Sequence, residues 1–207
     1  VYSMGGDIAP LPAILEVCQK HGARLAVDDA HSVGVLAQGR GTAAHFGITD
    51  QVDLITGTFG KALGGAMGGF VAARQPVVDL LRQRARPYLF SNALTPAVCG
   101  ASIAAIDIAG SSDGDKRRDR IRHNTQLFRQ HMTEAGFELL PGEHPIIPVM
   151  LHEASLAQTM SAELLEAGVL ASGFYFPVVP EGKARIRTQM SASLTVEQIE
   201  KAADIFT

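Results

Sequence analysis

Two short apolar segments, each ending in polar residues, constrain the fold of this 207-residue chain more than any other feature. Residues 24–28 read Arg-Leu-Ala-Val-Asp, and residues 52–58 read Val-Asp-Leu-Ile-Thr-Gly-Thr. Apolar runs of this length, bounded by turn-forming residues, are typical of buried β-strands. Each predicted strand delivers polar side chains at its carboxyl end, which is the edge where open α/β sheets bind ligands.

Helical patterns alternate with these strands. A helix is predicted over residues 10–21, where Leu11, Ile14, Leu15 and Cys18 repeat at helical spacing. Further strands are predicted at 69–73, 146–151 and 184–189, and further helices at 76–84, 95–109, 115–135, 154–167 and from Thr195, where Gln198 completes a capping box. This alternation predicts an α/β layer architecture, with an α+β pattern in the second part.

A polar stretch at residues 110–115 is the predicted linker between residues 1–110 and a smaller domain at 111–207. The chain begins without an initiator methionine and ends inside a predicted helix, so we expect it to be a piece of a longer polypeptide. A targeting segment could therefore lie outside it.

Composition narrows the expected partners and location. A formal charge of -3 provides no concentrated positive field for nucleic acid or an anionic membrane. No apolar run is long enough to span a bilayer. The two cysteines fit neither a disulfide framework nor a metal site, which favours a reducing, cytoplasmic location.

Lys61 lies in a glycine-rich segment after the second strand, where residues 56–65 read Thr-Gly-Thr-Phe-Gly-Lys-Ala-Leu-Gly-Gly. The segment is not a Walker phosphate loop, because Ile55 stands where that motif has glycine and Ala62 where it has serine or threonine. It is not a dinucleotide fingerprint either, because a strand follows it. Small residues around a lysine can expose a nucleophilic amine, although a surface lysine on a flexible loop would show the same pattern.

An acid and a histidine follow the first strand, at Asp28 and His31. Alone this pattern is weak, since a structural acid beside a turn histidine is more common. Together with Lys61, these residues are the parts that a pyridoxal phosphate site requires. The carboxylate holds a proton on the pyridine nitrogen, and the lysine forms the imine.

The segments 27–34, 39–41 and 53–65 resemble the α-oxoamine synthases. These enzymes are fold-type I pyridoxal phosphate-dependent transferases that condense an amino acid with an acyl-CoA. The resemblance extends over the whole chain but implies only the second half of the catalytic core. Residues 1–110 would be the second half of the large, mainly parallel, cofactor-binding domain, and residues 111–207 the small domain without the family's last residues.

The resemblance implies roles for individual residues around the cofactor. Lys61 would form the Schiff base and remove the substrate's Cα proton, and Asp28 would pair with the pyridinium nitrogen. His31 and Ser3 would bond the phenolic oxygen of the ring, and Thr58 would bind the phosphate.

Two further roles concern the partner subunit and the substrate. Ser91 would reach the phosphate in the partner subunit of a homodimer with shared active sites. Arg187 would bind the substrate carboxylate through two parallel hydrogen bonds. Arg185 has the same chemistry and lies on the same strand face, so this assignment of Arg187 depends on the motif.

The segments 86–92, 146–151, 177–180 and 184–191 most resemble the members that join glycine to acetyl-CoA. The implied reaction forms 2-amino-3-oxobutyrate and CoA, and its reverse is a step of threonine degradation. No metal is implied. The alternatives are a sister enzyme such as 8-amino-7-oxononanoate synthase, or an inactive fragment.

Overall fold

The computed structural model describes residues 1–90 and 93–207. The chain forms two compact units, which are described separately. The N-terminal unit comprises Val1 and Ala9–Lys116, and the C-terminal unit comprises Tyr2–Ile8 and Arg117–Thr207. Among the described residues, no helix combines the length and apolar character needed to cross a membrane.

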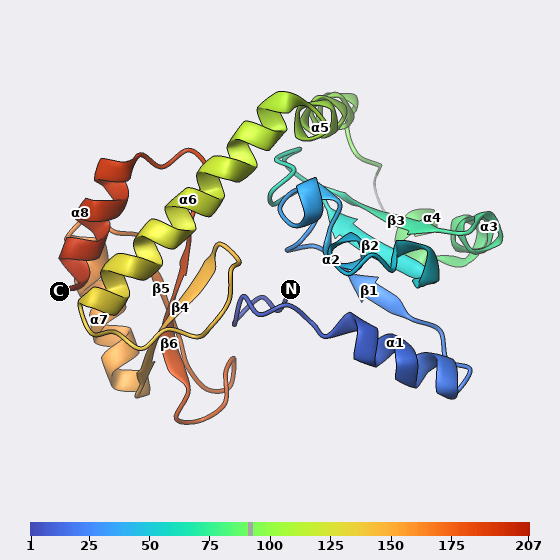
Figure 1. Cartoon of the computed structure of the whole chain (residues 1–207). Helices are drawn as coiled ribbons and strands as arrows, with labels where there is room; N and C mark the ends of the chain where they lie inside the picture. Colours follow the sequence, from blue (N-terminus) through green and yellow to red (C-terminus); the bar gives the residue numbers. More distant parts are fainter. Residues whose placement is uncertain (91–92) are drawn as a thin grey trace. The chain divides into compact units, whose positions relative to one another are not determined.

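The N-terminal unit contains a three-stranded sheet in the order β1-β2-β3 (Figure 1). Strand β1 (Ala26–Asp28) runs parallel to β2 (Leu54–Thr58), and β3 (Gly69–Ala73) runs antiparallel to β2. The ten residues between β2 and β3 are too few for a crossover helix, so the two strands pair as a hairpin. The three strands predicted in this unit are confirmed.

Helices precede, separate and follow these strands along the chain. Their bounds are α1 (Leu11–Lys20), η1 (Ala37–Gly39), α2 (Thr42–His45), η2 (Thr49–Gln51), α3 (Gln75–Arg84), α4 (Arg86–Phe90) and α5 (Pro96–Ala109). Leu11 and Leu15 of α1 are buried in one core cluster with Leu25 and Val27 of the β1 segment. This cluster fixes the strand whose carboxyl end carries Asp28.

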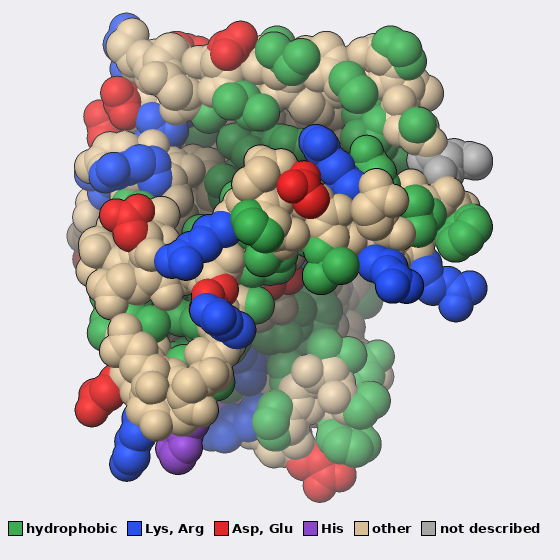
Figure 2. Space-filling view, turned by 90° about the vertical axis from the view of Figure 1, so that its right-hand side faces the viewer, with side chains coloured by type: hydrophobic (Ala, Val, Ile, Leu, Met, Phe, Trp, Pro, Cys, Tyr) green, Lys and Arg blue, Asp and Glu red, His purple; other side chains and the backbone are tan. Residues whose placement is uncertain are grey.

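Much apolar surface of the N-terminal unit is exposed, as the hydrophobic side chains in Figure 2 show. Helix α5 is rich in apolar residues all round, yet only Ser102 in it is buried. Ile103 is 62% exposed and Phe90 of α4 is 80% exposed. A helix that is apolar on every side is normally buried. This unit therefore exposes surface of a kind that folded domains usually cover.

The C-terminal unit has an antiparallel sheet in the order β4-β6-β5 (Figure 1). Its elements are α6 (Ser112–Glu134, beginning in the N-terminal unit), β4 (Ile146–His152), α7 (Ala154–Glu166), β5 (Ser172–Phe174), β6 (Ala184–Gln189) and α8 (Val196–Phe206). Alternate strand residues Ile147, Val149 and Ile186 pack with Phe128 of α6 and Ile199 of α8 in the main core. The predicted capping box at Thr195 is confirmed.

The predicted linker at residues 110–115 is wrong. Only Gly110 and Ser111 separate α5 from α6, because the polar residues begin the next helix. The hydroxyl of Ser111 accepts a hydrogen bond from the Asp113 amide, and acidic residues suit the first turn of a helix. Gly114 meets the carbonyl oxygens of the preceding helix, where a side chain would not fit. Five short elements, η1, α2, η2, α4 and β5, were not predicted, since each is too short to show a periodic pattern.

Candidate functional site

The parallel pairing of β1 and β2 brings their carboxyl ends to one edge of the N-terminal sheet. Asp28 lies opposite Thr56, and Thr58 ends β2. Asp28 is an exposed residue, and its Oδ1 accepts a hydrogen bond from the Ala30 amide at 3.0 Å. The carboxylate is therefore oriented by its own turn while solvent can still reach it.

The loops that follow these two strands pack against each other. Gly34 has a φ of +85°, and a Cβ built on it would lie 3.1 Å from the Ala62 Cβ and 3.3 Å from Leu63 Cδ2. A larger residue at position 34 would push the loops apart. The loop that carries His31 is thus held beside the loop that carries Lys61, whose side chain belongs to an exposed residue.

The hydroxyl of Thr58 closes the turn after β2. It donates to the Gly68 carbonyl at 3.1 Å and accepts from the Gly60 amide at 3.1 Å. A hydroxyl has one hydrogen to donate, and Gly68 receives it here. Donation from Thr58 to a phosphate, as predicted from the sequence, would require this bond to Gly68 to be released.

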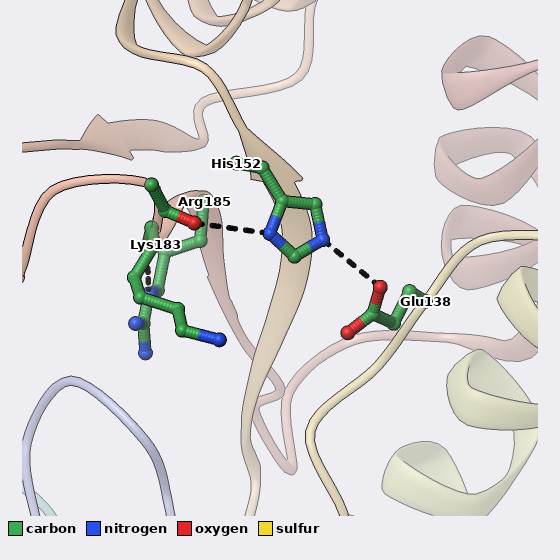
Figure 3. Close-up of polar contacts among 5 residues, drawn as sticks. Glu138, His152, Lys183 and Arg185 are labelled. Carbon is green, nitrogen blue, oxygen red and sulfur yellow. Dashed lines mark hydrogen bonds and ion pairs between the residues drawn. The ribbon is translucent and has the colours of Figure 1, made fainter.

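The two candidate arginines of β6 have different partners in the C-terminal unit. Arg185 donates from Nε to the Lys183 carbonyl at 3.0 Å, as Figure 3 shows, and from Nη1 to the Met4 carbonyl at 3.1 Å. Arg187 donates from Nη2 to Gln189 Oε1 at 3.1 Å. Its Nε is buried and has no partner among the described residues. Of these two arginines, Arg187 is the one with a buried donor that lacks a partner among the described residues.

Burial lowers the pKa of both guanidinium groups from the usual arginine value. A guanidinium remains charged across the physiological range. An unsatisfied buried N–H is costly, and a carboxylate is the partner that matches it best. The environment of Arg187 thus suits the binding of a carboxylate.

The remaining predicted residues are placed as follows. Ser3 is exposed in a tight turn of the C-terminal unit, closed by the Gly6 amide donating to the Tyr2 carbonyl at 2.9 Å. Ser91 lies outside the described residues. The structure places Ser3 and Arg187 in one unit, and the strand-edge residues Asp28 and Lys61 in the other.

The sequence patterns missed the buried Asp29, which lies between Asp28 and the turn containing His31. Its Oδ2 accepts a hydrogen bond from the Thr42 amide at 2.8 Å. Two adjacent aspartates give no sequence signal that separates an exposed carboxylate from a buried one. The apolar alternation of a three-residue strand is too short to provide that signal.

Comparisons with known proteins establish the family. The model of the class I and II aminotransferase family matches residues 1–206. This chain belongs to that family. The sequence predicts a fold-type I pyridoxal phosphate transferase fold. Solved structures of such transferases superpose on this chain and confirm the prediction.

The matching members of this family include α-oxoamine synthases, which confirms the predicted resemblance. The 2-amino-3-ketobutyrate coenzyme A ligase of Salmonella typhimurium is 50% identical over 208 residues, which cover 100% of this chain and 52% of that enzyme. The 8-amino-7-oxononanoate synthase of Fervidobacterium nodosum is 45% identical over 207 residues, with coverage of 100% and 52%.

A solved structure also matches the whole of this chain and about half of the other protein. The serine palmitoyltransferase of S. paucimobilis, in a complex described as a PLP–myriocin aldimine, superposes with a TM-score of 0.93 at 33% identity. That match covers 100% of this chain and 52% of the other. The chain spans about half the length of the curated relatives it matches.

Proposed function

We propose that this chain carries cofactor-binding and substrate-binding residues of a pyridoxal phosphate-dependent glycine C-acetyltransferase. The observation that carries the proposal is the packing of the loop bearing His31 against the loop bearing Lys61, at the edge of the sheet where β1 ends in Asp28. The identity of 50% to a 2-amino-3-ketobutyrate coenzyme A ligase supports the choice of glycine and acetyl-CoA as substrates. The reverse reaction would belong to threonine degradation.

The residues at the strand edge fit pyridoxal phosphate chemically. When bound, this cofactor supplies an electron sink for negative charge at the substrate's Cα. The exposed carboxylate of Asp28 would keep a proton on the ring nitrogen, and His31 would hydrogen-bond the phenolic oxygen. The side chain of Lys61, an exposed residue, would hold the cofactor covalently and then accept the Cα proton of glycine.

The carboxylate of glycine would bind to Arg187. Nε of Arg187 is buried without a partner, so a carboxylate oxygen would satisfy a donor that is otherwise costly. A planar guanidinium that donates two parallel hydrogen bonds fixes the direction of the carboxylate as well as its charge.

Three parts of the proposal concern the assembled enzyme. Ser3 would hydrogen-bond the phenolic oxygen and Thr58 the phosphate. Ser91 would reach the phosphate in the partner subunit of a homodimer. We further propose a cytoplasmic location, because the two cysteines are free thiols in the structure and suit a reducing compartment.

Borohydride reduction followed by peptide mapping tests the cofactor site. The 207-residue chain is incubated with pyridoxal phosphate, reduced and digested, and we expect the phosphopyridoxyl label on Lys61. Lys61→Ala should remove the label, whereas Lys183→Ala should leave it unchanged. A label confined to any other lysine would sink the proposal.

A second candidate function is that of a sister synthase. The specific observation in its favour is the 45% identity to an 8-amino-7-oxononanoate synthase, which approaches the value for the ligase. Release of free CoA thiol separates the two candidates. Turnover with glycine and acetyl-CoA supports the first, and turnover only with alanine and a longer acyl-CoA supports the second. A folded chain without label or turnover supports the inactive fragment.

A further inference from the structure

Asp29 is 2% exposed at the carboxyl end of β1. Its amide donates to the Thr56 carbonyl of β2 at 2.8 Å, and its own carbonyl accepts from the Ser32 and Val33 amides at 2.9 Å each. The backbone of Asp29 therefore joins the strand pair to the turn that follows. Asp28 and His31 lie on either side of this junction.

The side chain of Asp29 extends the junction to a third segment. Its Oδ2 accepts from the Thr42 amide at 2.8 Å, and the Thr42 hydroxyl donates to Ser32 Oγ at 2.6 Å. Thr42 and Ser32 are both fully buried. Gly41 has a φ of +89°, and a Cβ on it would overlap Asp29 Oδ2. The backbone at Gly41–Thr42 is thus packed directly on the carboxylate, at a position where glycine is required.

This arrangement has a cost in free energy. The other oxygen, Asp29 Oδ1, is buried and has no hydrogen-bond partner among the described residues. Buried polar atoms are normally paired, and an unpaired one beside a functional segment calls for an explanation. An apolar side chain at position 29 would avoid this cost in free energy but could not accept a hydrogen bond from the Thr42 amide.

We infer that Asp29 is a positioning residue, which clamps the Gly41–Thr42 backbone to the end of β1 and so holds Asp28 and His31 in place. The inference rests on the proposed function in taking Asp28 and His31 as the cofactor-binding groups. The amide of Ala30 reports on the clamp directly, because it donates to Asp28 Oδ1 at 3.0 Å. If the turn loosens, this hydrogen bond is lost.

Amide hydrogen exchange of the 207-residue chain, resolved to single residues, tests the clamp without cofactor. In Asp29→Ala we expect exchange at Ala30 and Thr42 to be faster by about tenfold or more, since a charge-assisted hydrogen bond to a buried amide is lost. Asp29→Asn should stay within about threefold of the wild type, because its side-chain carbonyl can accept the same hydrogen bond. Amides of β4 serve as the internal control.

Two further variants keep the test decisive if Asp29→Ala does not fold. Gly41→Ala should loosen Ala30 as Asp29→Ala does, because the added methyl displaces the carboxylate. Thr42→Val retains the backbone amide and loses only the hydroxyl, so Ala30 should keep its protection. Equal loosening by Thr42→Val and Gly41→Ala, or wild-type protection in a folded Asp29→Ala, would overturn the inference.

Titration with pyridoxal phosphate, followed by the imine absorbance, connects the clamp to the site. We expect Asp29→Ala to weaken apparent binding by about tenfold, with Asp29→Asn restoring it. Undiminished binding by Asp29→Ala overturns the inference, whatever its effect on stability. If the wild-type chain forms no imine, the proposed function fails, and the exchange at Ala30 alone decides the role of Asp29.

Discussion

Arg185 and Arg187 lie on one face of β6, yet they differ in their hydrogen-bond partners. Arg185 is buried and donates to the Met4 and Lys183 carbonyls, whereas Arg187 keeps a buried Nε without a partner. Strand alternation could not separate them at the sequence level, because residues two apart share a face. The partner that distinguishes them, Met4, is 181 positions away in the chain. Such long-range contacts leave no local pattern.

We predict opposite effects of removing the two arginines. Arg185→Ala should destabilise the C-terminal unit by about 1–3 kcal/mol, since two carbonyl groups lose their donors. Arg187→Ala should change stability little, because it removes an unsatisfied buried donor, but it should abolish the response of the imine absorbance to glycine. Urea unfolding and glycine titration measure the two effects. Equal destabilisation by both variants would contradict the proposed division of roles.

The conservative variant sharpens the test at Arg187. Lysine has a point charge and cannot donate two parallel hydrogen bonds in one plane. Arg187→Lys should therefore weaken glycine binding by about tenfold while retaining pyridoxal phosphate binding. Binding of glycine at wild-type strength by Arg187→Lys would show that charge alone is sufficient.

At the scale of elements, His152 joins the end of β4 to two loop segments. Its Nε2 lies 2.9 Å from Glu138 Oε2, and its Nδ1 lies 3.1 Å from the Gly182 carbonyl (Figure 3). The hydrogen bond to Glu138 and then that to Gly182 raise the pKa of His152 above its usual 6.5, against smaller opposing effects of desolvation and of the charge on Lys183. The protonated imidazole can donate to both acceptors at once.

The raised pKa of His152 predicts a pH dependence of stability. The stabilisation of the folded state by protonated His152 is fully present below pH 6.5, where the histidine of the unfolded chain is also protonated. This stabilisation is lost as pH rises through the higher pKa of the folded state. The difference in Tm between wild type and Glu138→Gln should therefore shrink on raising the pH between about pH 5.5 and pH 8.5. A difference that grows over this range would contradict the assignment of the charged pair.

Two glycines of neighbouring helices give a matched pair of substitutions. Gly114 of α6 meets the carbonyl oxygens of Ala109 and Ile108, whereas a Cβ on Gly100 of α5 meets nothing within 4 Å. Gly114→Ala should destabilise by about 1–3 kcal/mol through overpacking. Gly100→Ala should stabilise by about 0.5–1 kcal/mol through helix propensity. Thermal unfolding compares them, and a neutral Gly114→Ala would show that α6 can shift.

The elements that could be predicted have a hydrophobic pattern within their own residues. The features that were missed depend on contacts between segments that are apart in the chain. The apolar run ending at Asp28 and the stripe beginning at Leu11 gave the strand and the helix, because burial selects those residues directly. Gly114 was assigned to a linker from its composition, but its smallness serves a close approach between helices. The burial of Asp29 depends on Gly41 and Thr42, which lie on a later segment.

At the scale of the whole molecule, two observations belong together. The N-terminal unit exposes much apolar surface, and the chain matches only about half the length of its relatives. The chain corresponds to 52% of the Salmonella ligase, and its N-terminal unit leaves α5 almost wholly exposed. The sheet of this unit is short, and its outer strands β1 and β3 have one paired neighbour each. A polypeptide of the relatives' length would have further chain available to cover such a surface.

We therefore predict that the isolated chain self-associates through the surface of α5. Ile103 and Ile106 are 62% and 46% exposed, so replacing both by serine should lower the average mass in light scattering and reduce the binding of an apolar dye. Leu170→Ser, at a residue that is 86% exposed in the C-terminal unit, is the matched control and should have little effect. Adding the separately produced other half of the Salmonella ligase should reduce dye binding by the wild-type chain. If the serine pair and the control lower the mass equally, association depends on general surface hydrophobicity, because no particular helix face then contributes more than any other.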